Sequence, residues 1–206
     1  MAYRRSQAVQ ERIDATRARI VDAAHDLIAE RGYAGCSVAL VADAAGVATG
    51  SVYRHFPDKG ALFAEVFRTA TQREVDAVAE AGAKPGSIDE RVARAVETFA
   101  RRALKAPRLA YALIAEPVDP QVEAERLVDR RAYRDIFAQV IADAVDAGEL
   151  PAQDPEVAAA AVVGAMAEAL VVPLHAGIAS GRTVPELSAF IVRALGSTRG
   201  ATDAHS

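Results

Sequence analysis

The chain has 206 residues, of which 51% are hydrophobic and 25% are charged, so it is long enough to bury a sizeable core and too apolar for the disordered class. Its formal net charge of −4 is uneven, because residues 1–63 hold 8 Lys and Arg against 7 Asp and Glu, whereas residues 64–206 hold 16 against 21. The acidic total therefore does not exclude nucleic-acid binding by the first part of the chain.

The sequence contains none of the common signatures of an enzyme or a metal site. A single cysteine, Cys36, excludes an intramolecular disulfide and is expected to pack as a small hydrophobe. No cluster of Cys and His has metal-ligand spacing, and no glycine-rich phosphate loop, HExxH or GxSxG motif is present. We therefore expect no catalytic residues, no metal and no cofactor.

The first helix is predicted over residues 13–31. Its apolar face is formed by Ile13, Ile20, Ala24, Leu27 and Ile28. Gly32 is expected to end the helix as a C-cap glycine. Residues 1–12, with three arginines, are predicted to be a flexible arm, which is either a disordered tail or an arm that touches DNA.

Residues 37–59, SVALVADAAGVATGSVYRHFPDK, have the pattern of two short helices joined by a tight turn. The first apolar set is Val38, Val41, Ala42 and Ala45, and the second, beyond Gly46, is Val47, Val52 and Phe56. Ser37 is a natural N-cap for the first helix. The second helix, over about 49–55, exposes short residues and hydrogen-bond donors, a mixture that suits a helix lying in a DNA major groove.

This helix-turn-helix segment resembles a known family. Residues 16–67 are similar to the DNA-binding domain of the TetR (tetracycline-repressor-like) transcriptional regulators. The resemblance rests on the ordered set Glu30-Arg31-Gly32-Tyr33, Val41-Ala42, Ala45-Gly46-Val47, Gly50-Ser51-Val52-Tyr53-Arg54-His55-Phe56 and Asp58-Lys59. It covers a quarter to a third of the chain, and the remainder matches the family only in size and helical character.

The resemblance and the exposed side of the second helix together indicate the DNA-contacting residues. They are Ser37, Thr49, Gly50, Ser51, Tyr53, Arg54, His55 and Lys59. Two positions depart from the family pattern, because Ala48 stands where a capping serine is common and Thr49 where a lysine is common. Thr49 is therefore a base contact or a replacement helix cap. Arg54 is the candidate for a base-edge contact, although an exposed arginine equally suits a phosphate.

The rest of the chain predicts a larger helical domain, so the fold class is all-α. A long helix from residue 58 to about 80 leaves the first domain, and further helices are predicted over 88–105, 107–115, 120–148, 155–176 and 184–195. The expected domains are 1–63, for DNA binding, and 64–196, for ligand binding and dimerisation. A disordered tail is expected over 197–206.

The last two helices are apolar over most of their surface. The stretch 155–176 is interrupted by Glu168 and Pro173, so it does not suggest a membrane span. Helices so apolar must be buried on more than one side. The family resemblance implies that 155–176 and 184–195 pair with the same helices of a second copy in a homodimer, and the alternative is the core of a monomer.

Candidate ligand-contacting residues in the second domain are its aromatic and polar side chains among the helices of 67–176. They are Phe67, Phe99, Tyr111, Glu116, Tyr133, Phe137, Met166 and His175, and at helical spacing each also suits a structural core.

Taken together, these observations and the resemblance predict a cytoplasmic, ligand-responsive transcriptional regulator. It is expected to act as a repressor that binds a pseudo-palindromic DNA operator as a homodimer and is released by a small-molecule effector. The alternative is a helical small-molecule-binding protein or enzyme with a vestigial DNA-binding domain.

Overall fold

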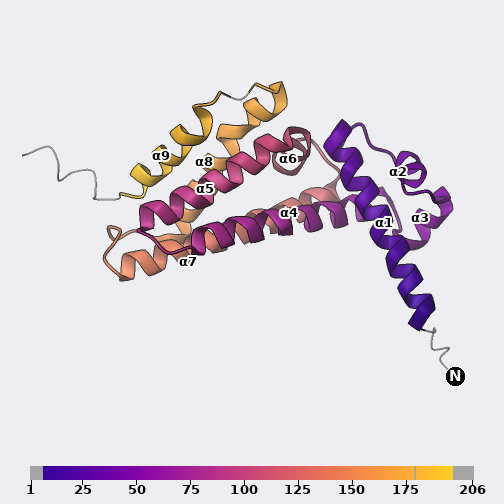
Figure 1. The fold of residues 1–206 in the computed structure, drawn as a ribbon, viewed down its shortest axis with the longest axis horizontal. Helices are drawn as coiled ribbons and strands as arrows, with labels where there is room; N and C mark the ends of the chain where they lie inside the picture. The colour runs from indigo at the N-terminus through magenta and orange to yellow at the C-terminus, as the bar shows by residue number, and fades with distance from the viewer. Residues whose placement is uncertain (1–6, 179, 197–206) are drawn as a thin grey trace, which may run out of the picture.

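The computed structural model describes residues 7–178 and 180–196, and every regular element within these ranges is a helix. The helices are α1 (Gln7–Arg31), α2 (Val38–Ala44), α3 (Thr49–His55), α4 (Lys59–Ala83), α5 (Ile88–Lys105), α6 (Pro107–Ile114), α7 (Pro120–Asp146), α8 (Pro155–Ala176) and α9 (Thr183–Ala194). Figure 1 shows a small head, α1 to α3, at one end of an elongated body formed by α4 to α9. The predicted all-α fold is confirmed for these ranges.

The helices of the head end and begin at capping residues that were predicted from the sequence. Gly32 adopts φ +75° just after α1, and its amide donates to the carbonyl of Ile28 at 2.8 Å. The hydroxyl of Ser37 accepts from the amide of Leu40 as the N-cap of α2, and Gly46 turns the chain towards α3 with φ +66°. Such a φ is unstrained only for glycine. Gly32 thus ends α1, Ser37 starts α2, and Gly46 separates α2 from α3.

One prediction about the head is wrong. α1 begins at Gln7, so residues 7–12 are helical and are not part of a flexible arm. The helix extends because residues 7–12 contain neither glycine nor proline, so nothing in the backbone stops it. Residues 1–6 and the predicted tail over 197–206 lie outside the described residues.

Helix α4 is shared between two hydrophobic cores. Near its start, Phe63 and Phe67 are fully buried in the head core together with Tyr33. Near its end, Val78 is fully buried in the core of the body. The proposed domain boundary between residues 63 and 64 therefore falls inside a continuous helix. Because one rigid helix belongs to both cores, a tilt of its far end must move the head.

The body packs α4 against α5 and α7, and α8 against α5, α6, α7 and α9. Helix α6 contacts α1 of the head as well as α5 and α8 of the body, so it bridges the two parts (Figure 1). By length and composition alone α8 could cross a membrane, with a mean hydropathy of 2.1. Packing against four other helices buries one part of the apolar surface of α8, and another part remains exposed.

Candidate nucleic-acid interface and internal cavity

The α3 helix is anchored by one side chain and exposes most of the others. Val52 is buried in the head core, whereas Thr49, Gly50, Tyr53 and Arg54 are exposed. Tyr53 leaves 51% of its surface accessible, an unusual exposure for a large aromatic residue. A side-chain carbon added at Gly50 would meet no atom within 4 Å, so another molecule can approach the backbone of α3 there.

The start of α3 settles the helix cap. Ala48 occupies the N-cap position, which lacks a side-chain cap hydrogen bond, and Thr49 is the first residue of the helix. Of the two alternatives for Thr49, the replacement helix cap is therefore wrong, and the base contact stays a prediction. The turn from Gly46 already orients the chain, and the amide of Ser51 donates to the carbonyl of Ala48 at 2.7 Å. The side chain of Thr49 remains exposed.

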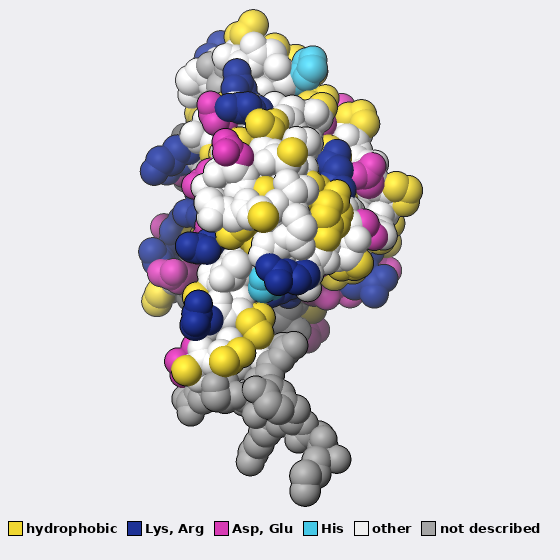
Figure 2. Space-filling model, turned by 90° about the vertical axis from the view of Figure 1, so that its right-hand side faces the viewer, with side chains coloured by type: hydrophobic (Ala, Val, Ile, Leu, Met, Phe, Trp, Pro, Cys, Tyr) yellow, Lys and Arg dark blue, Asp and Glu magenta, His cyan; other side chains and the backbone are white. Residues whose placement is uncertain are grey.

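The first turns of α1 lie beside α3. Arg12 and Thr16 from α1 line a shallow surface pocket with Ser51, Arg54 and His55 from α3. Arg54 donates from Nη2 to Ser51 Oγ at 2.7 Å, so its guanidinium lies along the helix surface. Five hydrogen-bonding side chains from two helices therefore share one concave surface. Figure 2 shows this end of the molecule, where Lys and Arg are interspersed with Asp and Glu rather than gathered in one patch.

The other two predicted DNA contacts lie outside α3: Ser37 is the N-cap of α2 and Lys59 is the first residue of α4. Ser37 is exposed while it caps α2. The ammonium of Lys59 lies 4.6 Å from the ring centroid of Tyr33 and 3.9 Å from a carboxylate oxygen of Asp119, so it is engaged within the protein. A phosphate contact by Lys59 stays a prediction and would compete with these contacts.

The loop between α6 and α7 is hydrogen-bonded to the head. The carboxylate of Glu116 accepts from the backbone amides of Tyr33 at 2.9 Å and Ala34 at 3.0 Å. The hydroxyl of Tyr33 donates to Asp119 at 2.5 Å. Burial and this hydrogen bond raise the pKa of Tyr33 above its ordinary value, so the hydroxyl stays protonated. These contacts attach the turn after α1 to the segment that follows α6.

The other end of the same loop is held by the buried guanidinium of Arg126. It donates to the carbonyls of Ala112 at 2.8 Å, Leu113 at 3.1 Å and Glu116 at 2.7 Å, which lie at and just beyond the end of α6. Its Nη1 also contacts the carboxylate of Glu123 at 2.5 Å. Arg126 therefore satisfies carbonyls that the end of a helix leaves without partners. It fixes α6 to α7.

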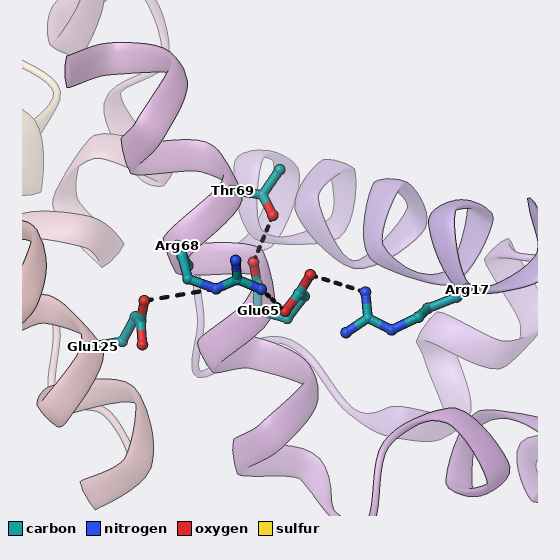
Figure 3. A network of polar contacts seen from close by, with 5 residues as sticks. All are labelled: Arg17, Glu65, Arg68, Thr69 and Glu125. Carbon is teal, nitrogen blue, oxygen red and sulfur yellow. Dashed lines mark hydrogen bonds and ion pairs between the residues drawn. The ribbon is translucent and has the colours of Figure 1, made fainter. Parts of the chain in front are cut away.

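A second connection joins α1, α4 and α7 through charged side chains (Figure 3). Glu65 of α4 accepts from Arg17 of α1 at 2.9 Å and also from Arg68. Arg68 in turn lies 3.8 Å from Glu125 of α7. The hydrogen bond from Arg17 is the main reason why the pKa of Glu65 is lowered. The head is therefore attached to the body by charged groups as well as by the shared helix.

Between α4, α5, α6, α7 and α8 lies a cavity of about 90 Å³. Its apolar wall includes Phe99, Leu109, Leu113, Ile114, Val163 and Met166. Its polar wall, on α4, α5 and α7, includes Thr71, Glu74, Arg102, Arg126, Asp129 and Tyr133. The rings of Phe99 and Tyr133 meet edge to face at 5.4 Å. A concave, mostly apolar site with a few polar groups is the usual form of a small-molecule site.

Three of the eight predicted ligand contacts line this cavity and five do not. Phe99, Tyr133 and Met166 line it. Phe67 and Phe137 are buried in the two cores instead. Tyr111 packs against the exposed ring of His175 at 4.9 Å, and Glu116 bonds to the head. Helical spacing does not determine which apolar residues face a void and which fill a core.

Of the polar wall of the cavity, only Tyr133 was among the predicted ligand contacts. Arg126, Asp129 and Tyr133 follow one another at intervals of three and four residues on α7. The same stripe begins at the buried Val122 and ends at the buried Phe137. Charged residues that interrupt an apolar stripe at helical spacing were the available signal, since such positions face the interior.

Both parts of the chain match models of one protein family. Residues 20–66 match "Bacterial regulatory proteins, tetR family", and residues 85–170 match "Tetracyclin repressor-like, C-terminal domain". The HTH-type transcriptional regulator AcrR of Shigella flexneri is 40% identical over 67 residues, which are 32% of this chain and 29% of that protein. The chain thus spans about a third of the length of the first curated relatives that it matches.

Longer matches extend the likeness to the body. The fatty acid metabolism regulator protein of Bacillus subtilis is 23% identical over 134 residues, 64% of this chain and 69% of that protein. The crystal structure of FadR from Bacillus subtilis in complex with stearoyl-CoA has a TM-score of 0.73 and 20% identity, and the match covers 86% of this chain and 96% of that one. The two family matches and the shared fold show that the chain belongs to the TetR family of bacterial regulatory proteins.

Proposed function

We propose that the protein is a ligand-responsive repressor that binds a pseudo-palindromic DNA operator as a homodimer in the cytoplasm. The exposed surface of α3 is the single observation that carries this proposal. Gly50 leaves the backbone open to approach, and the exposed Tyr53 and Arg54 carry hydrogen-bond donors on the same short helix. A helix with small residues and donors on its exposed side fits the major groove.

The proposed dimer interface is the exposed apolar face of α8 and α9. On α8, Val157 is 66% exposed and Val172 is 70% exposed, with the exposed Gly164 between them. On α9, Phe190 is 54% exposed. An apolar face of this kind favours association with another chain, and small residues let helices cross closely. These observations support pairing through α8 and α9, the helices that correspond to the predicted segments 155–176 and 184–195.

The proposed effector acts through the contacts that join the cavity to the head. Leu113 and Arg126 line the cavity, while Arg126 also holds the loop that bears Glu116. A ligand that separates α6 from α7 would therefore disturb the bonds from Glu116 to Tyr33 and Ala34. It would weaken DNA binding only as far as it prefers the conformation that does not fit the operator. The complex of a fold relative with stearoyl-CoA supports a small-molecule effector.

The experiment is a fluorescence-anisotropy titration of the purified protein with DNA from just upstream of its own gene, at two salt concentrations. A specific regulator should prefer this DNA over a scrambled duplex. Its affinity should fall with salt, by roughly 0.9 log unit per log unit of salt for each phosphate neutralised. Binding that ignores both sequence and salt would support the alternative of a helical small-molecule-binding protein with a vestigial DNA-binding domain.

A further inference from the structure

The charges that line the cavity are almost all matched by partners within the protein. Arg102 donates to both carboxylate oxygens of Glu74, at 2.5 and 2.8 Å. Arg126 is occupied by three backbone carbonyls and by Glu123. Arg130 is exposed and donates to the carbonyl of Ile114 at 3.2 Å. Arg102 and Arg126 are thus engaged with carboxylates, and the charge of Arg130 is exposed to solvent.

Asp129 is the exception. Its carboxyl is partly buried in the cavity wall and accepts a hydrogen bond from the hydroxyl of Thr71. Within the ranges that the structure describes, no Lys, Arg or His nitrogen lies within 4.0 Å of it. Two charges act on it from nearby, Glu125 and Arg68, and Arg68 is already engaged with Glu65 and Glu125. Asp129 therefore adds a negative charge to a mostly apolar cavity.

Burial makes this negative charge unfavourable. Desolvation raises the pKa of Asp129 from 3.8 to about 6, so at neutral pH the carboxylate is ionised without a cationic group in contact with it. A cation in the cavity would remove that penalty, whereas an anion would add to it. The aromatic rings of Phe99 and Tyr133, which line the same cavity, are a second group that attracts cations.

We propose that the cavity binds a small organic monocation, an apolar or aromatic molecule with one protonated nitrogen that pairs with Asp129. This proposal rests on the proposed function, because it names the class of effector for the same cavity. The cavity holds about 90 Å³, which is below the roughly 300–1,000 Å³ of pockets that enclose drug-sized ligands. A ligand larger than a single ring must therefore widen it. Widening the cavity requires its helices to move apart, and one of them, α7, bears both Asp129 and Arg126.

The test compares three probes of similar size on the full-length protein without DNA. Phenylethylamine is a cation at pH 7.5, phenylethanol is neutral and phenylacetate is an anion. Ligand-detected NMR titrations should give a dissociation constant for the amine on the order of tenfold lower than for the alcohol, with the carboxylate weakest. Equal affinities, a preference for the carboxylate, or no binding of the amine at millimolar concentration would overturn the proposal.

Two variants test whether Asp129 is the source of the preference for the amine over the alcohol. Asp129→Asn should abolish the difference between amine and alcohol, and melting curves should show that the variant is folded. The matched control is Asp135→Asn, which neutralises an exposed aspartate of the same helix and should keep the preference. If Asp135→Asn removed the preference and Asp129→Asn did not, the assigned partner would be wrong.

A separate assay distinguishes this proposal from the proposed function. Anisotropy measures whether the amine releases DNA. Specific DNA binding together with a cavity that prefers the carboxylate would refute the ligand class alone. Binding of the amine that depends on Asp129, without specific DNA binding, would refute the regulator alone.

Discussion

The carboxylate of Glu116 and the backbone amide of Tyr33, 83 residues apart in the chain, are joined by a hydrogen bond of 2.9 Å. A second bond, from Ala34 to the same carboxylate at 3.0 Å, makes the contact bidentate. Because Glu116 lies just beyond the end of α6 and Tyr33 just beyond the end of α1, this contact links the body directly to the head. Arg126, which donates to the backbone carbonyl of Glu116, also lines the cavity.

Replacing Glu116 by glutamine should loosen the head. The amide can accept one of the two hydrogen bonds but presents a donor to the other, so we expect a loss of about 1–3 kcal/mol in the free energy of unfolding. Urea denaturation followed by circular dichroism measures this change. The control Glu149→Gln alters an exposed residue after α7 and should leave stability unchanged. Equal stability of the two variants would show that the contact to Tyr33 contributes nothing.

Substitutions on α3 should distinguish a residue that contacts the DNA phosphates from one that contacts the bases. Tyr53→Ala should lower affinity for all DNA sequences, because a phosphate contact carries no base information. Arg54→Ala should cost about 1–3 kcal/mol on the preferred sequence and relax the preference at one base pair. Anisotropy with a panel of single-base operator variants distinguishes the two patterns, and the exposed Gln139→Ala on α7 serves as the control. An unchanged preference in Arg54→Ala would contradict its base-reading role.

The pH dependence of stability should reveal Asp129. Its folded-state pKa, raised to about 6, lies above the ordinary value of 3.8, so the folded chain holds a proton that the unfolded chain has released. The stability contributed by this carboxyl therefore falls as pH rises through that window. Asp129→Asn should stabilise the protein at pH 7 by about 1–2 kcal/mol, allowing for solvent screening, and should have little effect at pH 3.

The contribution of Glu65 to stability should change with pH in the opposite direction, because Arg17 and Arg68 lower the pKa of Glu65. Its contribution to stability is present above its ordinary value of 4.5 and is lost as pH falls below it. Thermal melting of wild type, Asp129→Asn and Asp135→Asn from pH 3 to 8 isolates the contribution of Asp129, whereas the loss of stability in acid that includes Glu65 should be common to all three. A stability difference between wild type and Asp129→Asn that does not vary with pH would argue against a raised pKa.

A charge on α9 should disrupt the proposed dimer. Phe190→Glu places a carboxylate on the exposed apolar face, so we expect monomers in sedimentation and at least a tenfold loss of DNA affinity, since two linked heads bind far better than one. The comparison variant is Leu40→Glu, which puts the same charge on an exposed leucine of α2 and should remain dimeric. Dimers that persist in Phe190→Glu would place the interface elsewhere.

Local signals in the sequence determined much of the fold. The helices of the head begin and end at residues that the sequence already indicated, namely Gly32, Ser37, Gly46 and Asp58. These positions could be predicted because capping depends on residues within one turn. The ordered motif around Tyr53 was likewise sufficient to indicate the family.

Only the tertiary structure decided which side chains meet. Phe67 was a candidate ligand contact and fills the head core, whereas Asp129, not among the candidates, lines the cavity. Glu116 bonds to Tyr33, a partner far away in the chain. The rotation of each helix about its axis, set by packing against its neighbours, determines whether a residue faces a core, a void or another helix. A local pattern, such as the stripe through Arg126, Asp129 and Tyr133, can indicate that a position faces the interior, but it does not determine which side chains lie opposite.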